Sequence, residues 1–588
     1  MRRVDKYTLF LIIFIILAFI IRLFIILRPA SELVTYNGDD MYYYLKIAEN
    51  ILEGKGASFD GINTTNGFHP LYLLLILPIM KIFLWNKLLA SYSALILLML
   101  FNIFTAIFIY TIVVLLTKNK DAALISAFIW LFNPWNIFIP MTGVEVAVSS
   151  FFIGASLYAY INFKIKGNND FSKIRIWQIV ILGILLGLAI LSRSDSIFIA
   201  IAIGLDIIYN VIRKKNFFKN VGKIIGKIAI LTLTTILTIS PWIIWSRVNT
   251  GLWVQGSGVA LMYNSMNGIG LSGTLYKIMF GGAFGLFKIF NYTVTAPFLA
   301  LIIGLIIGSI ISYKIKISKI FRNILIFLAL ALLVYAASLP EAVHYPAGLV
   351  VAVKLSIVSS LILLFGLIIG LNTKILSMKE KLNKKNIENN LPVILGLLFM
   401  TGFYLLLFWH HQPWYFLSIL LLLIILLGNI FDILLSKIKK FRIKKAALII
   451  ILVLSLLFII RLTVLYSASI CPWQHDMYSG AIYLKENISE DAKIGAFNAG
   501  IFSYFSDRTI VNLDGVVNYG IVEYKKSGGK IINYLRDNNI EYVIDYPCFL
   551  SEFKNEITPI YSVPVKYDPF CENSGPVIYK VNNIRGEK

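Results

Sequence analysis

The stretch Tyr36-Asn37-Gly38-Asp39-Asp40-Met41-Tyr42-Tyr43-Tyr44 places two adjacent carboxylates directly after a long apolar run, residues 7–27. An apolar run of about 21 residues is long enough to cross a bilayer as a helix. The sequence therefore predicts a first membrane helix, a turn at Asn37-Gly38, and a second helix over 42–52 with Asp39 as its N-cap. One cap needs only one aspartate, so the pair also suggests acid–base chemistry or cation binding.

The composition is that of a membrane protein, because 58% of the 588 residues are hydrophobic. A shorter apolar run at 70–84 begins with His69-Pro70 and is expected to lie at the membrane surface. The longer runs predict about 13 transmembrane helices by the length rule. These spans are 7–27, 88–116, 122–139, 145–162, 176–191, 197–212, 228–245, 297–313, 323–338, 349–371, 391–408, 414–435 and 446–466.

The net charge of +23 is concentrated in short loops between the apolar runs, which argues against nucleic-acid binding. With the N-terminus inside, the loops on the cytoplasmic side hold 30 of the 54 Lys and Arg residues. All five histidines then fall on the outer side, as do both aspartates of the pair. Titratable groups gathered at one membrane face predict a reaction site there.

The composition changes at Cys471, where the apolar runs shorten to strand length. Predicted helices at 499–505 and 530–538 alternate with these strands, so we expect a small α/β domain over 471–588 on the outer side. Its cysteines, Cys548 and Cys571, can pair if the compartment is oxidising. The predicted strands are 492–497, 509–513, 540–544, 557–563 and 577–581.

Three other polar sites lie at outer helix ends. Glu145 begins an apolar helix, where a carboxylate is also stabilised by the helix dipole. Arg193 and Asp195 interrupt two apolar runs, either as a self-neutralising pair or with the arginine binding phosphate. A third site combines the outer turn that contains His410, His411 and Tyr415 with Lys354, a lysine inside a predicted span. Together these residues could line a pocket for an anionic head group.

The order of helix, Asp-Asp pair, short His-Pro-Leu-Tyr helix and second span resembles the membrane-embedded glycosyltransferases of the C superfamily. Protein O-mannosyltransferases, bacterial aminoarabinose transferases and mycobacterial arabinofuranosyltransferases share this plan. The Trp-Trp-Asp motif of the oligosaccharyltransferase branch is absent, which disfavours en bloc transfer of a glycan to protein. The resembling segments are 39–44, 65–71, 142–145, 191–195, 498–505 and 511–515.

The resemblance implies a multi-pass plasma-membrane enzyme that moves a hexose or pentose from a polyprenyl-phosphate donor to an extracytoplasmic acceptor. Membrane lipid surrounds residues 1–470, and the catalytic loop is 28–87. Asp39 and Asp40 are the catalytic candidates, with Asp39 favoured as the base. The resemblance implies no certain cofactor and leaves a divalent cation open, for which Asp40 and Glu145 are the candidate ligands. Donor or acceptor binding is expected from His69, Glu145, Arg193, Asp195, Lys354, His410, His411 and Tyr415.

Two other functions compete with this interpretation. A transporter or flippase of polyprenyl-linked glycans would also be polytopic, but transporters usually contain internal repeats and polar sites near the bilayer midplane. A membrane-anchored binding protein would leave the Asp pair unexplained. Because the sequence contains no Walker A, HExxH or GxSxG motif, it gives no support to nucleotide-driven transport or serine hydrolysis.

Overall fold

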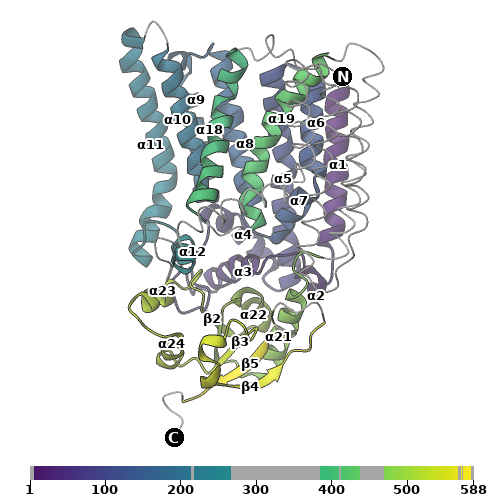
Figure 1. Ribbon diagram of the computed structural model, residues 1–588, viewed down its shortest axis with the longest axis vertical. Coiled ribbons are helices and arrows are strands. Elements are labelled where there is room, and N and C mark those ends of the chain that lie inside the picture. Colours follow the sequence, from purple (N-terminus) through teal and green to yellow (C-terminus); the bar gives the residue numbers. More distant parts are fainter. Residues whose placement is uncertain are drawn as a thin grey trace, which may run out of the picture.

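A computed structural model describes residues 5–213, 217–266, 384–408, 412–437, 469–566, 571 and 574–583. A bundle of long helices forms one end of the molecule and a mixed α/β domain forms the other (Figure 1). Between them lie α2 (Ala30–Leu33), α3 (Asp39–Leu52), α4 (Pro70–Phe83) and α12 (Gly256–Met266). The protein is thus a polytopic helical membrane protein with a C-terminal α/β domain, as the sequence predicts.

Each predicted span within the described residues falls on a helix, and the spans 297–313, 323–338, 349–371 and 446–466 lie outside them. Seven helices of the described part are long and apolar enough to cross a membrane. The bundle consists of α1 (Lys6–Ile26), α5 (Lys87–Thr117), α6 (Lys120–Phe132), α7 (Pro134–Phe138), η1 (Ile139–Thr142), α8 (Val146–Lys166), η2 (Phe171–Lys173), α9 (Ile176–Ser192), η3 (Ser194–Ser196), α10 (Ile197–Ile212), α11 (Phe217–Thr250), α18 (Lys384–Leu406), η5 (Pro413–Phe416) and α19 (Leu417–Lys437).

The predicted span 122–139 is broken rather than continuous, because the chain bends by 57° between α6 and α7. Pro134 has no N–H to continue α6, and the side chain of Asn133 caps the new helix by accepting from the Trp135 amide at 3.0 Å. Arg22 of α1 is fully buried at the break and donates to the carbonyl oxygens of Leu131 and Asn136, at 3.0 and 3.3 Å. A buried guanidinium therefore satisfies carbonyl groups that the break leaves without helical partners.

The beginning of α3 differs from the prediction. Gly38, and not Asp39, is the N-cap, so both aspartates lie in the first turn of the helix. Asp39 does not cap its own helix because its carboxylate is turned toward the C-terminal domain, as described below. The short helix predicted at 70–84 is confirmed as α4, with Pro70 at its first position.

The C-terminal domain contains a five-stranded sheet in the order β2-β1-β3-β5-β4. Strands β2, β1 and β3 are parallel, whereas β5 pairs antiparallel with β3 and β4. All five predicted strands and both predicted helices are present. The elements are α21 (Gln474–Asn487), β1 (Lys493–Ala496), α22 (Ala499–Ser506), β2 (Thr509–Asn512), α23 (Tyr519–Lys526), α24 (Ile531–Asp537), β3 (Tyr542–Asp545), η6 (Ser551–Glu556), β4 (Ile557–Ser562) and β5 (Val577–Val581).

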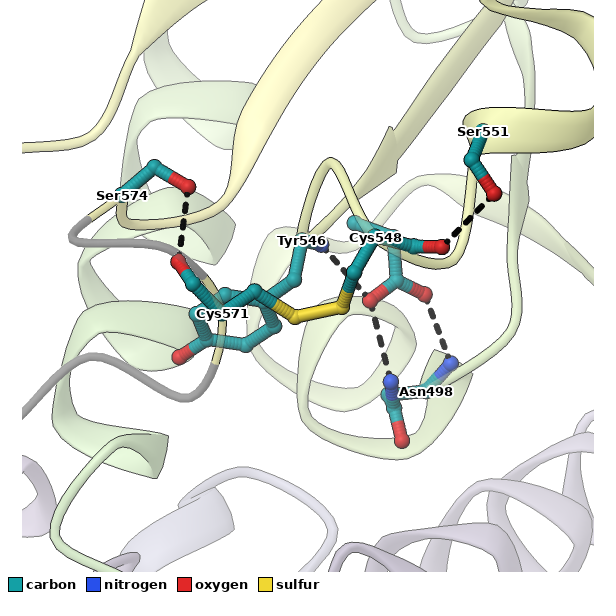
Figure 2. Close-up of a disulfide and its surroundings, with 7 residues drawn as sticks. Asn498, Tyr546, Cys548, Ser551, Cys571 and Ser574 are labelled. Carbon is teal, nitrogen blue, oxygen red and sulfur yellow. Dashed lines mark hydrogen bonds between the residues drawn. A yellow bond between two sulfur atoms is a disulfide. The ribbon is translucent and has the colours of Figure 1, made fainter. Parts of the chain in front are cut away.

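A disulfide joins Cys548, in the turn after β3, to Cys571, ahead of β5 (Figure 2). Beside it, the buried Asp545 at the end of β3 accepts hydrogen bonds from the amides of Phe497 and Asn498, each at 2.9 Å. Asp545 thereby fixes the loop that leads from β1 into α22. That loop carries the N-terminus of α22 to α3.

Candidate active site

The turn at Asn37-Gly38, directly before the two aspartates, is hydrogen-bonded to η1. The Asn37 side chain donates to the Met141 carbonyl at 2.6 Å, and the Gly38 amide donates to the Thr142 carbonyl at 2.9 Å. Tyr42 then donates to the Asn37 side-chain oxygen at 2.9 Å. Because η1 follows the break that Arg22 stabilises, the broken span fixes the position at which α3 begins.

Asp39 is engaged by the C-terminal domain. Its two carboxylate oxygens accept from the amides of Gly500 and Ile501, at 2.9 and 2.7 Å, in the first turn of α22. A Cβ on Gly500 would lie 2.2 Å from the Asp39 carbonyl oxygen, so only glycine allows this approach. The N-terminus of a helix stabilises an anion, and Asp39 is the anion that this helix binds.

Asp40 is in the opposite situation. Among the described residues, no donor makes a hydrogen bond to its carboxylate, although the side chain is mostly buried. Burial, with added repulsion from Asp39, Asp514 and Glu145, raises the pKa of Asp40 to about 8. With a pKa of about 8, Asp40 carries its proton in most molecules at neutral pH, and the ionised form that can accept a proton from a hydroxyl group becomes the major one only above that pH.

Glu145 is the centre of a buried polar network at the N-terminus of α8. One of its oxygens accepts from Arg193 at 2.6 Å and lies 3.4 Å from His69 Nε2, while Tyr44 donates to the other at 2.8 Å. Gln255 donates to His69 Nδ1 at 2.8 Å, which leaves the ring proton on the nitrogen that faces Glu145. Burial lowers the pKa of His69, so the ring is neutral at neutral pH.

Arg193 is shared by two carboxylates. It donates to Glu145 and, through Nε, to Asp195 at 2.9 Å. A further hydrogen bond of 3.0 Å reaches the Tyr404 hydroxyl, and the guanidinium lies 4.7 Å from the centre of the Tyr415 ring. Tyr404 also donates to Asp195. The side chain is only 7% exposed, so Arg193 is a buried bridge rather than half of a surface ion pair.

Comparisons with known proteins give two kinds of match. A family model described as a domain of unknown function, DUF8728, matches residues 473–577, and no curated protein matches the chain. The chain is similar to archaeal oligosaccharyltransferase AglB from Archaeoglobus fulgidus in complex with an inhibitory peptide and a dolichol-phosphate. That match has 13% identity and a TM-score of 0.46, and it covers 91% of this chain and 69% of the other.

The chain is also similar to ArnT from Cupriavidus metallidurans bound to undecaprenyl phosphate, with 10% identity and a TM-score of 0.47, covering 98% of this chain and 99% of the other.

The structure brings most of the sequence-predicted residues together. His69, Glu145, Arg193, Asp195 and Tyr415 belong to one connected network beside α3. Lys354, His410 and His411 lie outside the described residues.

Four residues at the site were missed by sequence reasoning. Tyr44 stands in the opening stretch, and Asp514 in a segment that carries the family resemblance. Either could have been singled out. Tyr404 lies within an apolar run and Gln255 belongs to no recognisable motif, so the sequence around them did not indicate a site.

Glu145, one of the two predicted cation ligands, does not fit a metal ion. Glu145 has both oxygens occupied by Arg193, His69 and Tyr44, and a cation there would lie beside a guanidinium. In the part of the chain that the structure describes, no group of three or more His, Cys, Asp or Glu side chains could hold a metal ion. We therefore assign no step to a metal.

Proposed function

We propose that the protein is a membrane glycosyltransferase that moves a sugar from a polyprenyl-phosphate-linked donor to an extracytoplasmic acceptor, with Asp40 as the base. The observation that carries the proposal is the Asp40 carboxylate, which is mostly buried and has no hydrogen-bond donor among the described residues. It stands where the family resemblance places a catalytic aspartate. Asp39, which the sequence favours as the base, already accepts two amide hydrogen bonds.

The chemistry needs one proton acceptor and one leaving group. Asp40 takes the proton of the acceptor hydroxyl as the acceptor oxygen bonds to the anomeric carbon of the sugar. The bond from that carbon to the phosphate oxygen breaks, and its electron pair leaves with the polyprenyl phosphate. The proton on Asp40 then returns to water.

The role of Arg193 in holding the phosphate stays a prediction. The guanidinium already neutralises Glu145 and Asp195, so a phosphate would have to compete with two carboxylates. In the described state Arg193 is a positioning residue. It holds Glu145, which in turn binds Tyr44 of α3, one helical turn after Asp40.

The orientation that we propose puts the site and the C-terminal domain outside the cytoplasm. Two observations support it. The basic loops predict an inside N-terminus. The disulfide between Cys548 and Cys571 is typical of an oxidising compartment.

The test is release of polyprenyl phosphate by the purified protein in lipid nanodiscs, with a panel of polyprenyl-phosphate sugars as donors. The wild type should release polyprenyl phosphate from at least one donor, and Asp40→Asn should reduce the rate by at least about a hundredfold. No release from any donor, or wild-type rates in Asp40→Asn, would contradict the proposal. Donor movement across the bilayer without cleavage would instead indicate a transporter.

A further inference from the structure

The loop 512–518, which follows β2, is fixed by its own hydrogen bonds. Asn512 accepts from the Gly515 amide at 3.0 Å, and Asp514 accepts from the Val516 amide at 2.8 Å. The side chain of Asn518 closes the loop by donating to the Asn512 carbonyl at 3.0 Å. The backbone of Asp514 is therefore held in one place by three contacts within the loop.

The same loop contacts three separate segments of the membrane part. A Cβ on Gly67 would lie 2.0 Å from the Val516 carbonyl oxygen, so the chains touch directly there. Asn264 of α12 donates to the Asp514 carbonyl at 2.9 Å. Asn512 donates to the Tyr43 hydroxyl at 3.5 Å, and Tyr43 lies three residues after Asp40 on α3.

On α3, Asp40 lies one turn before two tyrosines, each of which contacts a different part of the molecule. Residues three and four positions apart on a helix lie on the same side. Tyr43 reaches the loop of the C-terminal domain and Tyr44 reaches Glu145. The face of α3 that carries Asp40 thus lies between loop 512–518 on one side and the Glu145 network on the other.

We propose that Asp514 is the acceptor-binding residue of the C-terminal domain, which orients the incoming hydroxyl toward Asp40. This inference rests on the proposed function. It gives the C-terminal domain a direct part in the reaction. Burial raises the pKa of Asp514 to about 6, so this carboxylate is still ionised at neutral pH and accepts hydrogen bonds from hydroxyl groups.

The proposal also defines the chemical class of the acceptor. Asp39, Asp40 and Asp514 interact electrostatically with one another, and Lys525, the cation beside Asp514, is directed at the Leu513 carbonyl at 3.3 Å. A carboxylate or phosphate on the acceptor would meet the negative charge of Asp514 at this place, and that of Asp40 once Asp40 is ionised. We therefore infer that the reacting end of the acceptor is an uncharged, hydroxylated group such as a neutral sugar.

The kinetic test compares Asp514→Asn with the wild type and with Asp491→Asn. Asp491 is an exposed aspartate of the same domain and serves as the matched control. The probes are water alone, octyl β-D-glucoside and octyl β-D-glucuronide, each with a polyprenyl-phosphate sugar that the wild type cleaves.

Asp514→Asn should lower kcat/KM for the glucoside about ten- to a hundredfold, mainly through KM, because a charged hydrogen bond to the acceptor is lost. The ratio of kcat/KM for the glucoside to kcat/KM for the glucuronide should be smaller in the same variant than in the wild type. Asp491→Asn should match the wild type. Unchanged acceptor kinetics and an unchanged preference in Asp514→Asn would overturn the inference.

A second measurement does not depend on turnover. Cysteines at positions 40 and 514, in a Cys471→Ser background, should be joined by a short bifunctional thiol reagent in the full-length protein. Cysteines at 40 and 491 should not be joined. Absence of the 40–514 cross-link would refute the placement of Asp514, whereas absence of donor cleavage by the wild type would refute the proposed function alone.

Discussion

At the scale of single residues, the two neighbouring aspartates differ in what surrounds them. Asp40→Asn should abolish transfer and yet stabilise the protein at pH 8–9, because it removes a buried charge that has no hydrogen-bond donor in the part of the chain that the structure describes. The folded protein keeps the proton on Asp40 up to about pH 8, whereas an unfolded chain releases it near pH 4. Raising the pH across that range therefore costs the wild type stability and leaves the variant unaffected.

The measurement is a series of thermal melts from pH 5 to pH 9, with Asp491→Asn as the control. The melting temperatures of Asp40→Asn and the wild type should diverge as the pH rises. A constant difference across the series would show that Asp40 carries no raised pKa.

A substitution of Asp39 should weaken the docking of the C-terminal domain onto α3 more than it impairs proton transfer. Asp39→Asn removes a charge from the N-terminus of α22, which should cost about 1 kcal/mol of stability. Gly500→Ala should have a similar effect without touching the carboxylate, because its Cβ would meet the Asp39 carbonyl at 2.2 Å.

Thermal melts and limited proteolysis of the C-terminal domain measure this effect. Gly520→Ala is the control, since the nearest atom to its added Cβ is a side-chain oxygen at 3.4 Å, an ordinary contact distance. Transfer should fall in parallel with docking in both variants, while its pH dependence stays that of the wild type. If the C-terminal domain of Asp39→Asn docks as stably as in the wild type but the variant is inactive, Asp39 and not Asp40 is the base.

At the scale of elements, Arg193 joins the ends of α8, α9 and α18 through Glu145, Asp195 and Tyr404. Arg193→Met should lower the free energy of unfolding by about 3–5 kcal/mol, because it leaves two buried carboxylates without their cation. Arg193→Lys keeps the charge but loses the fork of donors, so it should also destabilise the protein. Because Arg193 is buried, this loss should be larger than at an exposed arginine.

The matched control is Arg213→Met, which removes an ion pair with Glu388 at a side chain that is 39% exposed. Exposed pairs contribute about 0–1 kcal/mol, so this variant should melt close to the wild type. If Arg193→Met and Arg213→Met have the same melting temperature, the network around Glu145 does not stabilise the protein more than an exposed ion pair does.

At the scale of the whole molecule, the C-terminal domain and the loop between α8 and α9 lie at opposite ends of the bundle (Figure 1). If the domain is extracytoplasmic, a cysteine at exposed Ser527 should react with a membrane-impermeant thiol reagent in intact cells. A cysteine at exposed Lys173 should react only after the membrane is opened. The reverse pattern of labelling would invert the proposed topology.

The sequence by itself determined the architecture. The apolar runs, the strand lengths after Cys471 and the short helix at Pro70 are local properties, and burial of apolar surface decides them within a few turns of chain. The same local patterns located the Asp pair, Glu145 and Arg193. They did not predict the break at Asn133 and Pro134, where Arg22 of another helix donates to carbonyl oxygens on both sides of the break.

Only the tertiary structure decided which aspartate is free. Asp39 and Gly500 are 461 positions apart in the chain, and their hydrogen bond depends on how the C-terminal domain docks. The same docking brings Asp514 to the site and leaves Asp40 without partners among the described residues. Two adjacent, chemically identical carboxylates cannot be told apart by composition or spacing, because their chemistry is set by which groups approach them across the fold.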